Sequence, residues 1–297
     1  YLSHNHLADD SARLFSLLLN VNPTIQGLDL SNNSFTADGI AKLTQAMMTN
    51  DKLHFLYLRD MHLTDASIVS VAKLLQQAQH LTALDLSNNR LSEASIAQLT
   101  KALAINSRLT TLGLYGCHLR HQGHAIAQLL AKLPQLQWLD LGGNDLGSSD
   151  MTEISSTFAN HQQLKGLDLS ANRLTDDDVI RLSEHLGEAK GLLRLMLHHN
   201  QIGDKGLSVL LSALDQSQSI YTLALNNNQI SQASTDSLAQ FIRQSPSLTN
   251  LFIFDNPMPA LSSDLLKDTA SKLDRLTVVA QNDVDMGIVD ESHKAYL

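Results

Sequence analysis

Several residue classes are scarce in this sequence, and each scarcity excludes a class of protein. Cys117 is the single cysteine among 297 residues, so no disulfide can form within the chain. Aromatic residues make up only 4%, so leucine and alanine must fill the core. The net charge of -9 disfavours nucleic acid as a partner, because nucleic-acid-binding proteins usually carry a basic stripe. No apolar run reaches the roughly 18 residues of a membrane span, so we expect no membrane insertion.

One eleven-residue pattern dominates what is present. Residues 81–91 read L-x-x-L-x-L-x-x-N-x-L, in which leucines at positions four and six alternate with residues of the opposite face. The pattern recurs in steps of 28 residues, with one step of 27. Its nine copies begin at Ile25, Leu53, Leu81, Leu109, Leu136, Leu164, Leu192, Ile220 and Leu248. Each copy predicts a short strand whose leucines are buried.

An amphipathic segment follows each strand. Its apolar residues recur at i, i+3 and i+7, as in Ile96, Leu99 and Leu103, which is helix spacing. A small residue precedes most of these segments and is a candidate helix cap, as Thr36, Thr64, Ser92, Thr175 and Ser231 show. Because helices need more room than strands when stacked, the array should bend with its strands inside. The sequence predicts an α/β solenoid: a right-handed horseshoe with a concave parallel sheet of nine or ten strands and convex helices.

The repeats set the predicted domain organisation. We expect a single domain over residues 1–297, with a partial repeat at 1–24, nine repeats over 25–258 and a capping region at 259–297. In the partial repeat, Leu14, Phe15 and Leu18 form the predicted apolar helix face. The helix of the fourth full repeat should use Ile126, Leu129 and Leu133, in a shifted register. Residues 273–278 resemble a last strand, and residues 282–297 should cap the end or be partly disordered.

The repeat resembles the ribonuclease-inhibitor-like class of leucine-rich repeat proteins, most closely over residues 192–207. That class includes enzyme inhibitors, GTPase activators, sensor domains and effectors secreted by bacteria. The resemblance therefore implies a non-enzymatic module for protein–protein interaction. The scarcity of cysteine departs from the mammalian inhibitors and disfavours a ribonuclease as the target.

Positions three, five and seven of each pattern should point out of the concave face. Exposed aromatic residues and arginine within an acidic field are typical of a protein interface, although aromatic residues also favour strands in general. The predicted partner-binding residues are Phe55, Tyr57, Arg59, Asp85, Tyr115, Trp138, Asp140, Asp168, Arg194, His198, Phe252 and Phe254. We expect Phe55, Tyr57 and Trp138 to be exposed. Position five also forms an acidic column of Asp29, Asp85, Asp140 and Asp168. The expected partner is therefore a folded protein with a basic patch. We expect the chain to bind it as a monomer.

The sequence gives less support to a catalytic site or a metal-binding site. His118, His121 and His124 have H-x-x-H-x-x-H spacing, but no carboxylate or cysteine completes a zinc site. Cys117 occupies the position of the conserved-pattern asparagine, so a buried structural residue is the favoured interpretation over a catalytic thiol. Residues 176–178 are three aspartates in a first helical turn, where acids stabilise the helix dipole. We expect no catalytic residue, no metal and no cofactor.

The most specific functional hypothesis is an inhibitor or regulator that occludes the active site of a partner enzyme. The alternative is a GTPase-regulating or sensor-type scaffold. The chain opens in mid-repeat, since residues 2–7 match the second half of the pattern, so we expect natural N-terminal residues to be missing. The expected location is intracellular and cytoplasmic, with secretion by a bacterium into a host cytosol as the variant that the resemblance implies.

Overall fold

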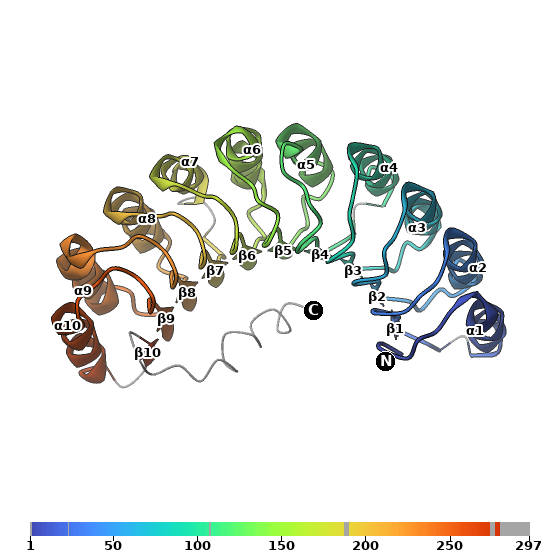
Figure 1. The fold of residues 1–297 in the computed structure, drawn as a ribbon, viewed down its shortest axis with the longest axis horizontal. Coiled ribbons are helices and arrows are strands. Elements are labelled where there is room, and N and C mark those ends of the chain that lie inside the picture. The colour runs from blue at the N-terminus through green and yellow to red at the C-terminus, as the bar shows by residue number, and fades with distance from the viewer. Residues whose placement is uncertain (1, 23, 107, 187–189, 274–276, 280–297) are drawn as a thin grey trace. The chain divides into compact units, whose positions relative to one another are not determined.

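The computed structural model describes residues 2–279 apart from residues 23, 107, 187–189 and 274–276. The chain divides into two compact units, unit 1 (Tyr1–Asp140) and unit 2 (Leu141–Tyr296). Both consist of strands and helices that alternate along the chain (Figure 1). Each unit is therefore an α/β repeat array, as the sequence predicts.

Unit 1 contains five parallel strands in chain order. The register pairs residues 28 apart, so Leu28 lies beside Leu56 and Leu56 beside Leu84; one step of 27 places Leu139 beside Leu112. Its elements are α1 (Asp9–Val21), β1 (Gly27–Asp29), α2 (Ala37–Met47), β2 (Phe55–Tyr57), α3 (Asp65–Gln77), β3 (Ala83–Asp85), α4 (Glu93–Leu103), β4 (Thr111–Gly113), α5 (Gly123–Leu130) and β5 (Trp138–Asp140).

Unit 2 repeats the arrangement with strands β6 to β10, of which β6–β7, β7–β8, β8–β9 and β9–β10 pair in parallel. Its elements are α6 (Ser148–Ile154), the 3₁₀ helix η1 (Ser155–Asn160), β6 (Gly166–Asp168), α7 (Asp176–Leu186), β7 (Arg194–Met196), α8 (Asp204–Ser217), β8 (Thr222–Ala224), the 3₁₀ helix η2 (Gln232–Ser234), α9 (Thr235–Gln244), β9 (Asn250–Phe252), α10 (Ala260–Ser271) and β10 (Thr277–Val279).

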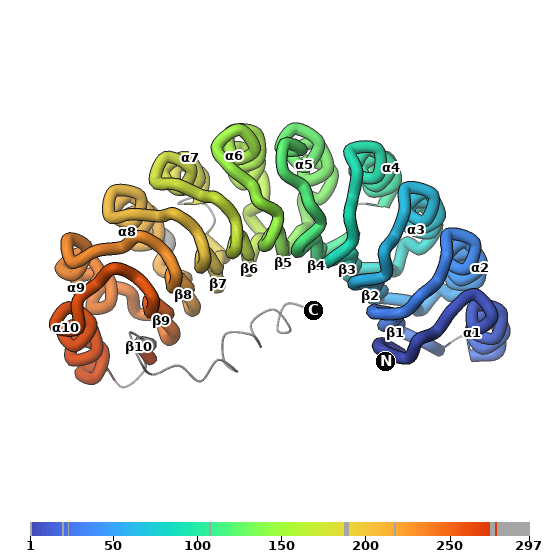
Figure 2. The backbone as a smooth tube through the Cα atoms, in the orientation of Figure 1, coloured from blue at the N-terminus to red at the C-terminus, as the bar shows by residue number. Residues whose placement is uncertain are grey.

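In each unit the helices cover one face of the sheet, and the described residues place no helix on the other (Figures 1 and 2). We call this second surface the helix-free face. Side chains alternate between the two faces along a strand. The middle residue of each strand points towards the helices, and Leu56, Leu84, Leu112 and Leu139 are at most 1% exposed. Positions three, five and seven of the pattern lie on the helix-free face, as predicted.

The pattern asparagine joins each repeat to its neighbour. The Asn89 amide nitrogen donates to the carbonyl oxygens of Leu58 and Leu86, both at 2.8 Å. Its side-chain oxygen accepts from the backbone N–H groups of Met61 at 3.1 Å and Leu63 at 3.0 Å. A buried carboxamide with all these contacts satisfies turn groups that would otherwise lack partners. The asparagine is therefore a structural requirement of the repeat.

Cys117 takes this position in the fourth full repeat. Its thiol is fully buried and donates to the carbonyl oxygens of Leu86 at 3.3 Å and Tyr115 at 3.6 Å. Burial raises the pKa of the Cys117 thiol to about 12, so the reactive thiolate is suppressed. The prediction of a buried structural residue is confirmed. Met61 occupies the same position in another repeat and is 2% exposed, and its thioether side chain has no N–H to donate.

The helix caps form a second link between repeats. Thr64 and Ser92 accept backbone N–H groups at the starts of α3 and α4, as predicted. The Asp65 carboxylate then accepts the Ser92 hydroxyl of the next repeat at 2.6 Å, a contact that lowers the pKa of Asp65. In unit 2, Asp176 accepts the backbone N–H of Gly203 at 2.6 Å. Asp176 thus links successive repeats, and Asp178 accepts the Thr175 hydroxyl at 2.7 Å at the start of α7.

Two helical registers test the predicted apolar faces. Ile126 and Leu129 of α5, and Leu133 just after it, are at most 1% exposed, which confirms the shifted register. In α1 the prediction was wrong. Leu14 is 67% and Leu18 43% exposed, whereas the helix buries Ala12 and Leu19. Residues 12, 15 and 19 precede the buried residues 40, 43 and 47 of α2 by one repeat of 28, so the repeat period predicts this face better than local hydrophobicity.

The predicted end of the array is described in part. β10 begins at Thr277, within the segment expected to form a last strand. The predicted capping tail, residues 282–297, lies outside the described residues. Within the described part of the chain, no helix is long and apolar enough to cross a membrane.

Candidate functional site on the helix-free face

The predicted binding residues lie on the helix-free faces, but their exposure differs from the prediction. Half-buried residues can contact a partner directly, whereas buried ones cannot without rearrangement. The half-buried members are Phe55, Arg59, Tyr115, Trp138 and Arg194. The buried members are Tyr57, Asp85, Asp140, Asp168, His198, Phe252 and Phe254. Four of the five half-buried residues belong to unit 1.

An aromatic stack lies on β2 and the residues that follow it. The rings of Phe55 and Tyr57 stack with centroids 5.1 Å apart. The Arg59 guanidinium lies 5.3 Å from the centre of the Tyr57 ring, within the range of a cation–π contact. Tyr57 is therefore covered by Phe55 and Arg59 and is only 7% exposed. The prediction that Tyr57 is exposed was wrong, because its neighbours at positions three and seven lie over it.

Phe55 and Trp138 occupy position three of their repeats and are half-buried rather than exposed. Phe55 leans over the neighbouring strand β1. A side chain at Gly27 would place its Cβ 1.8 Å from the Phe55 ring, so the glycine provides the space in which this ring lies. A fixed aromatic ring with one accessible face loses little conformational entropy on binding.

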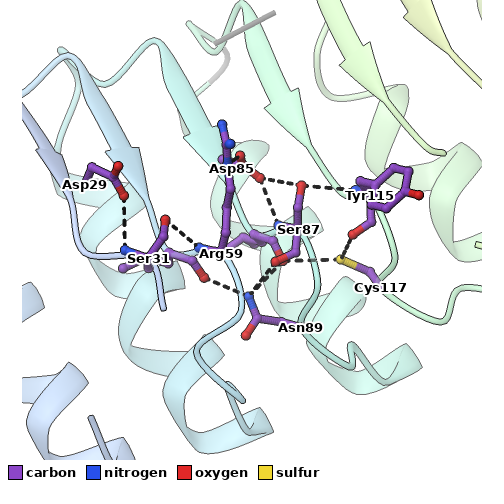
Figure 3. Close-up of polar contacts among 10 residues, drawn as sticks. Asp29, Ser31, Arg59, Asp85, Ser87, Asn89, Tyr115 and Cys117 are labelled. Carbon is purple, nitrogen blue, oxygen red and sulfur yellow. Dashed lines mark hydrogen bonds and ion pairs between the residues drawn. The ribbon is translucent and has the colours of Figure 1, made fainter. Parts of the chain in front are cut away.

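Arg59 is held by an ion pair with Asp85 of the next strand (Figure 3). The Asp85 side chain is 1% and the Arg59 side chain 28% exposed. Asp85 also accepts the backbone N–H of Ser87 at 2.9 Å and its hydroxyl at 2.5 Å. Burial lowers the pKa of Arg59, while the charges of Asp29, Tyr57 and Asp140 oppose this shift. Every charged group of this pair thus has a partner within the layer.

Ser31 and Ser87 are site residues that sequence reasoning missed. Both occupy position seven and extend the layer from strand to strand (Figure 3). The Ser31 hydroxyl accepts the backbone N–H of Arg59 at 3.1 Å, and the Ser87 hydroxyl accepts that of Tyr115 at 3.2 Å. The two serines lie two 28-residue repeats apart, with Arg59 at the same position of the repeat between them. The sequence pattern shows that they share a face, but not that they hold the backbone of Arg59 and Tyr115.

The predicted column of solvated aspartates was wrong in its exposure. Asp85 and Asp168 are fully buried and Asp140 is 8% exposed, whereas Asp29 is half-buried. Gly113 contributes to this burial, because a Cβ there would lie 2.4 Å from the Asp85 carboxylate. Adjacent strands lie about 4.8 Å apart, so the side chains of one column contact each other. Polar side chains of a column can therefore form hydrogen bonds and ion pairs with one another.

Unit 2 presents a different helix-free face. All of its residues at positions five and seven between β6 and β9 are buried, including Met196, Phe252 and Phe254. The Asp168 carboxylate accepts the backbone N–H of Ser170 at 2.8 Å. In contrast to unit 1, the Ser170 hydroxyl and both polar atoms of the Asn226 carboxamide are buried and have no hydrogen-bond partner.

The histidines do not form a metal site in the described part of the chain. His118, His121 and His124 are exposed, and the His124 ring nitrogen lies 2.9 Å from the Gln128 amide nitrogen. Among the described residues, no group of three histidine, cysteine or acidic side chains is arranged to hold a metal ion. The His198 and His199 rings lie edge to face with centroids 5.4 Å apart.

Three comparisons with known proteins show what this chain is similar to. Residues 21–43, 77–94 and 192–211 match a family model described as leucine-rich repeat. These three segments are similar to leucine-rich repeats. No curated protein matches it. Among solved structures, an internalin from Listeria monocytogenes is similar, with 19% sequence identity, a TM-score of 0.43, and coverage of 93% of this chain and 95% of that one.

Proposed function

We propose that this chain is a non-enzymatic binding module that holds a folded protein partner against the helix-free face of unit 1. Leucine-rich repeat proteins generally mediate protein–protein interactions, which supports this class of function. One observation supports the location: Phe55, Arg59, Tyr115 and Trp138 are half-buried side chains on one sheet face, and Phe55 and Arg59 are already held in place. Aromatic residues and arginine are enriched among the residues that dominate binding energy.

The Arg59–Asp85 pair gives this surface a specific chemical character. Asp85 is buried, so its charge acts on Arg59 and not on solvent. The carboxylates of Asp29 and Asp60 are half-buried and remain accessible at the edges of the same face. With a chain charge of -9, these groups favour a partner that carries a basic patch. Such complementarity would accelerate association more than it would raise affinity.

The more specific form of the proposal is an inhibitor or regulator that occludes the active site of a partner enzyme. The resemblance to the ribonuclease-inhibitor-like class supports it, and the same resemblance supports a role as a bacterial effector in a host cytosol. The alternative is a GTPase-regulating or sensor-type scaffold. An inhibitor reduces the partner's turnover at saturation, a GTPase regulator changes nucleotide hydrolysis, and a passive scaffold changes neither.

The proposed surface is tested by affinity isolation with mass spectrometry, using wild type, Trp138→Ala and Tyr221→Ala as bait. Tyr221 is 43% exposed and lies in unit 2, so it is a matched aromatic control. A partner of the proposed surface should be recovered with wild type and Tyr221→Ala and lost with Trp138→Ala. Titration of that partner should then show a loss of about thirtyfold in affinity for Trp138→Ala, which corresponds to about 2 kcal/mol.

Two results would count against this location. Partners recovered equally with all three baits would place the interface elsewhere on the chain. Equal loss with Trp138→Ala and Tyr221→Ala would point to a general effect of removing exposed aromatic residues. Circular dichroism of each bait, which should be unchanged, shows that the fold is retained.

A further inference from the structure

The helix side of unit 2 contains a groove between two neighbouring helices, α8 and α9 (Figure 1). Its volume is about 250 Å³. A bulk water molecule takes up about 30 Å³, so the groove has the space of roughly eight waters. It is therefore large enough for a small ligand or for one protruding side chain. Its polar lining residues are Ser208, Ser212 and Asp215 of α8 and Ser237, Gln240 and Gln244 of α9.

Asp215 supplies the one charged group among the described residues that line the groove. Its Oδ1 atom is buried and has no hydrogen-bond partner. Asp215 also lies in the last turn of α8, which contains no basic residue. The C-terminal end of a helix carries partial negative charge, so the helix dipole and this carboxylate reinforce one another. The groove therefore favours a cation.

The serine hydroxyls of the groove can accept hydrogen bonds from a ligand but have no donor left to offer. The Ser212 hydroxyl donates to the carbonyl oxygen of Ser208 at 3.0 Å. The Ser237 hydroxyl donates to the carbonyl oxygen of Ser234 at 2.9 Å. A hydroxyl has one O–H, so both retain only lone pairs. A ligand that carries several N–H donors is therefore complementary to these side chains.

Two buried apolar residues complete the groove. Leu211 of α8 and Phe241 of α9 line it and are 5% and 3% exposed. An ammonium group is strongly hydrated, whereas a guanidinium is planar, more weakly hydrated and carries five N–H donors. A guanidinium can therefore contact the apolar residues with its faces while its edge donates to Asp215. A divalent metal ion is disfavoured, because it prefers several charged oxygen ligands and the groove has one carboxylate.

We propose that the groove between α8 and α9 binds a guanidinium group, which donates to the Asp215 carboxylate and to the hydroxyl oxygens of Ser212 and Ser237. The group can belong to a free small molecule or to an arginine side chain of another polypeptide, because the groove recognises the same chemistry in both. This site lies on the helix side of unit 2. It goes beyond the proposed partner-binding surface of unit 1 and does not depend on it.

Nuclear magnetic resonance titration of the isotope-labelled full chain tests the proposal. N-acetyl-arginine methylamide should shift the amide signals of residues 208–215 and 237–244 in a saturable way. The neutral isostere N-acetyl-citrulline methylamide should bind at least about tenfold more weakly, because it lacks the charge that pairs with Asp215. Agmatine has the guanidinium without the peptide groups. Tighter binding of agmatine assigns the site to a free compound, and tighter binding of the arginine compound assigns it to a polypeptide.

Two variants of the full chain show whether Asp215 is responsible. Asp215→Asn removes the charge at nearly constant shape and should weaken binding of the arginine compound by about tenfold or more. The matched control, Asp236→Asn, removes the same charge from α9 at an exposed residue outside the groove and should bind like wild type. Thermal unfolding of Asp215→Asn should begin no lower than that of wild type, because Oδ1 has no hydrogen-bond partner to lose.

Several results would overturn the proposal. Equal affinity of wild type and Asp215→Asn would show that the carboxylate does not bind the ligand. Equal affinity for the arginine and citrulline compounds would show that the groove does not recognise the charge. Shifts spread over the acidic surface of the chain would indicate unspecific attraction. Calcium chloride that produces the same shifts without a guanidinium compound would assign the groove to a metal ion instead.

Discussion

The helix-free faces of unit 1 and unit 2 differ in the hydrogen bonding of their buried polar side chains. In unit 1 the polar groups of the layer satisfy one another: Arg59 pairs with Asp85, and Asp85 accepts from Ser87. In unit 2, the Ser170 hydroxyl and the Asn226 carboxamide are also buried, but neither side chain has a hydrogen-bond partner. The comparison shows that the repeat determines which residues share a face. The identity of those residues then determines whether the buried polar side chains of the face have hydrogen-bond partners. The polar side chains of unit 1 are therefore satisfied within their own face, whereas the Ser170 hydroxyl and the Asn226 carboxamide are not.

The largest expected effect comes from breaking the ion pair of unit 1. Arg59→Ala leaves the Asp85 carboxylate buried without its counter-ion, so the free energy of unfolding should fall by about 3–5 kcal/mol. Urea denaturation measures this loss. Adding Asp85→Asn to Arg59→Ala removes the stranded charge and should recover part of the stability. A single variant as stable as wild type would show that the Arg59–Asp85 ion pair does not stabilise unit 1.

The next effect contrasts two asparagines of unit 2 that are two residues apart. Asn228 belongs to the ladder: its amide nitrogen donates to Leu197 and Leu225, and its oxygen accepts from Ile202. Asn228→Ala should therefore cost about 3 kcal/mol of unfolding free energy.

The Asn226 side chain has no hydrogen-bond partner, so Asn226→Leu removes unsatisfied polar atoms at similar volume. Its unfolding free energy should lie within about 1 kcal/mol of wild type or above it. Chemical denaturation of both variants measures the contrast. Equal losses at the two positions would show that Asn226 is satisfied in solution.

A smaller effect appears in the dependence of stability on pH. The folded pKa of Cys117 is raised from an ordinary value of 9.0 to about 12. A raised folded pKa means that the stabilisation is fully present below pH 9 and is lost as pH rises towards 12. Wild type should lose about 1 kcal/mol more than Cys117→Ser between pH 9 and pH 10. Parallel pH profiles would indicate that the thiol ionises freely in the folded state.

The smallest effect concerns the backbone at position eight. Ala171 has φ of +49°, whereas Gly116 and Gly143 take this left-handed conformation at their own position eight. A β-carbon disfavours it, so Ala171→Gly should stabilise the chain by up to about 1 kcal/mol. Thermal unfolding should show a small rise in midpoint. A fall would mean that the Ala171 methyl group makes packing contacts that outweigh the strain.

Much of the fold follows from the period alone. The leucines at positions four and six predict the strands and their register, and the pattern asparagine predicts the ladder that Asn89 forms. Where the most hydrophobic residues of a helix did not match the repeat period, the prediction based on hydrophobicity was wrong. In α1 it favoured Leu14 and Leu18, but the residues equivalent to the α2 core are Ala12 and Leu19. A residue's place in the repeat outweighs its own hydrophobicity.

The candidate site was less predictable. The pattern gives the direction of a side chain but not what lies over it. Tyr57 points out of the sheet as predicted, yet Phe55 and Arg59 cover it. Asp85 likewise points outwards and is neutralised by Arg59 from the preceding repeat. These contacts depend on rotamers and on space left by glycines such as Gly27, which a one-dimensional pattern does not describe.

Hydroxyl-radical footprinting of the full chain tests the difference between the two faces most directly. Met196 and Trp138 both have readily oxidised side chains, so similar exposure should give similar labelling. The account predicts rapid oxidation of half-buried Trp138 in unit 1 and strong protection of Met196, which is 1% exposed in unit 2. Oxidation of Met196 as fast as that of half-buried Met48, or faster than that of Trp138, would contradict the burial of Met196 on the unit 2 face.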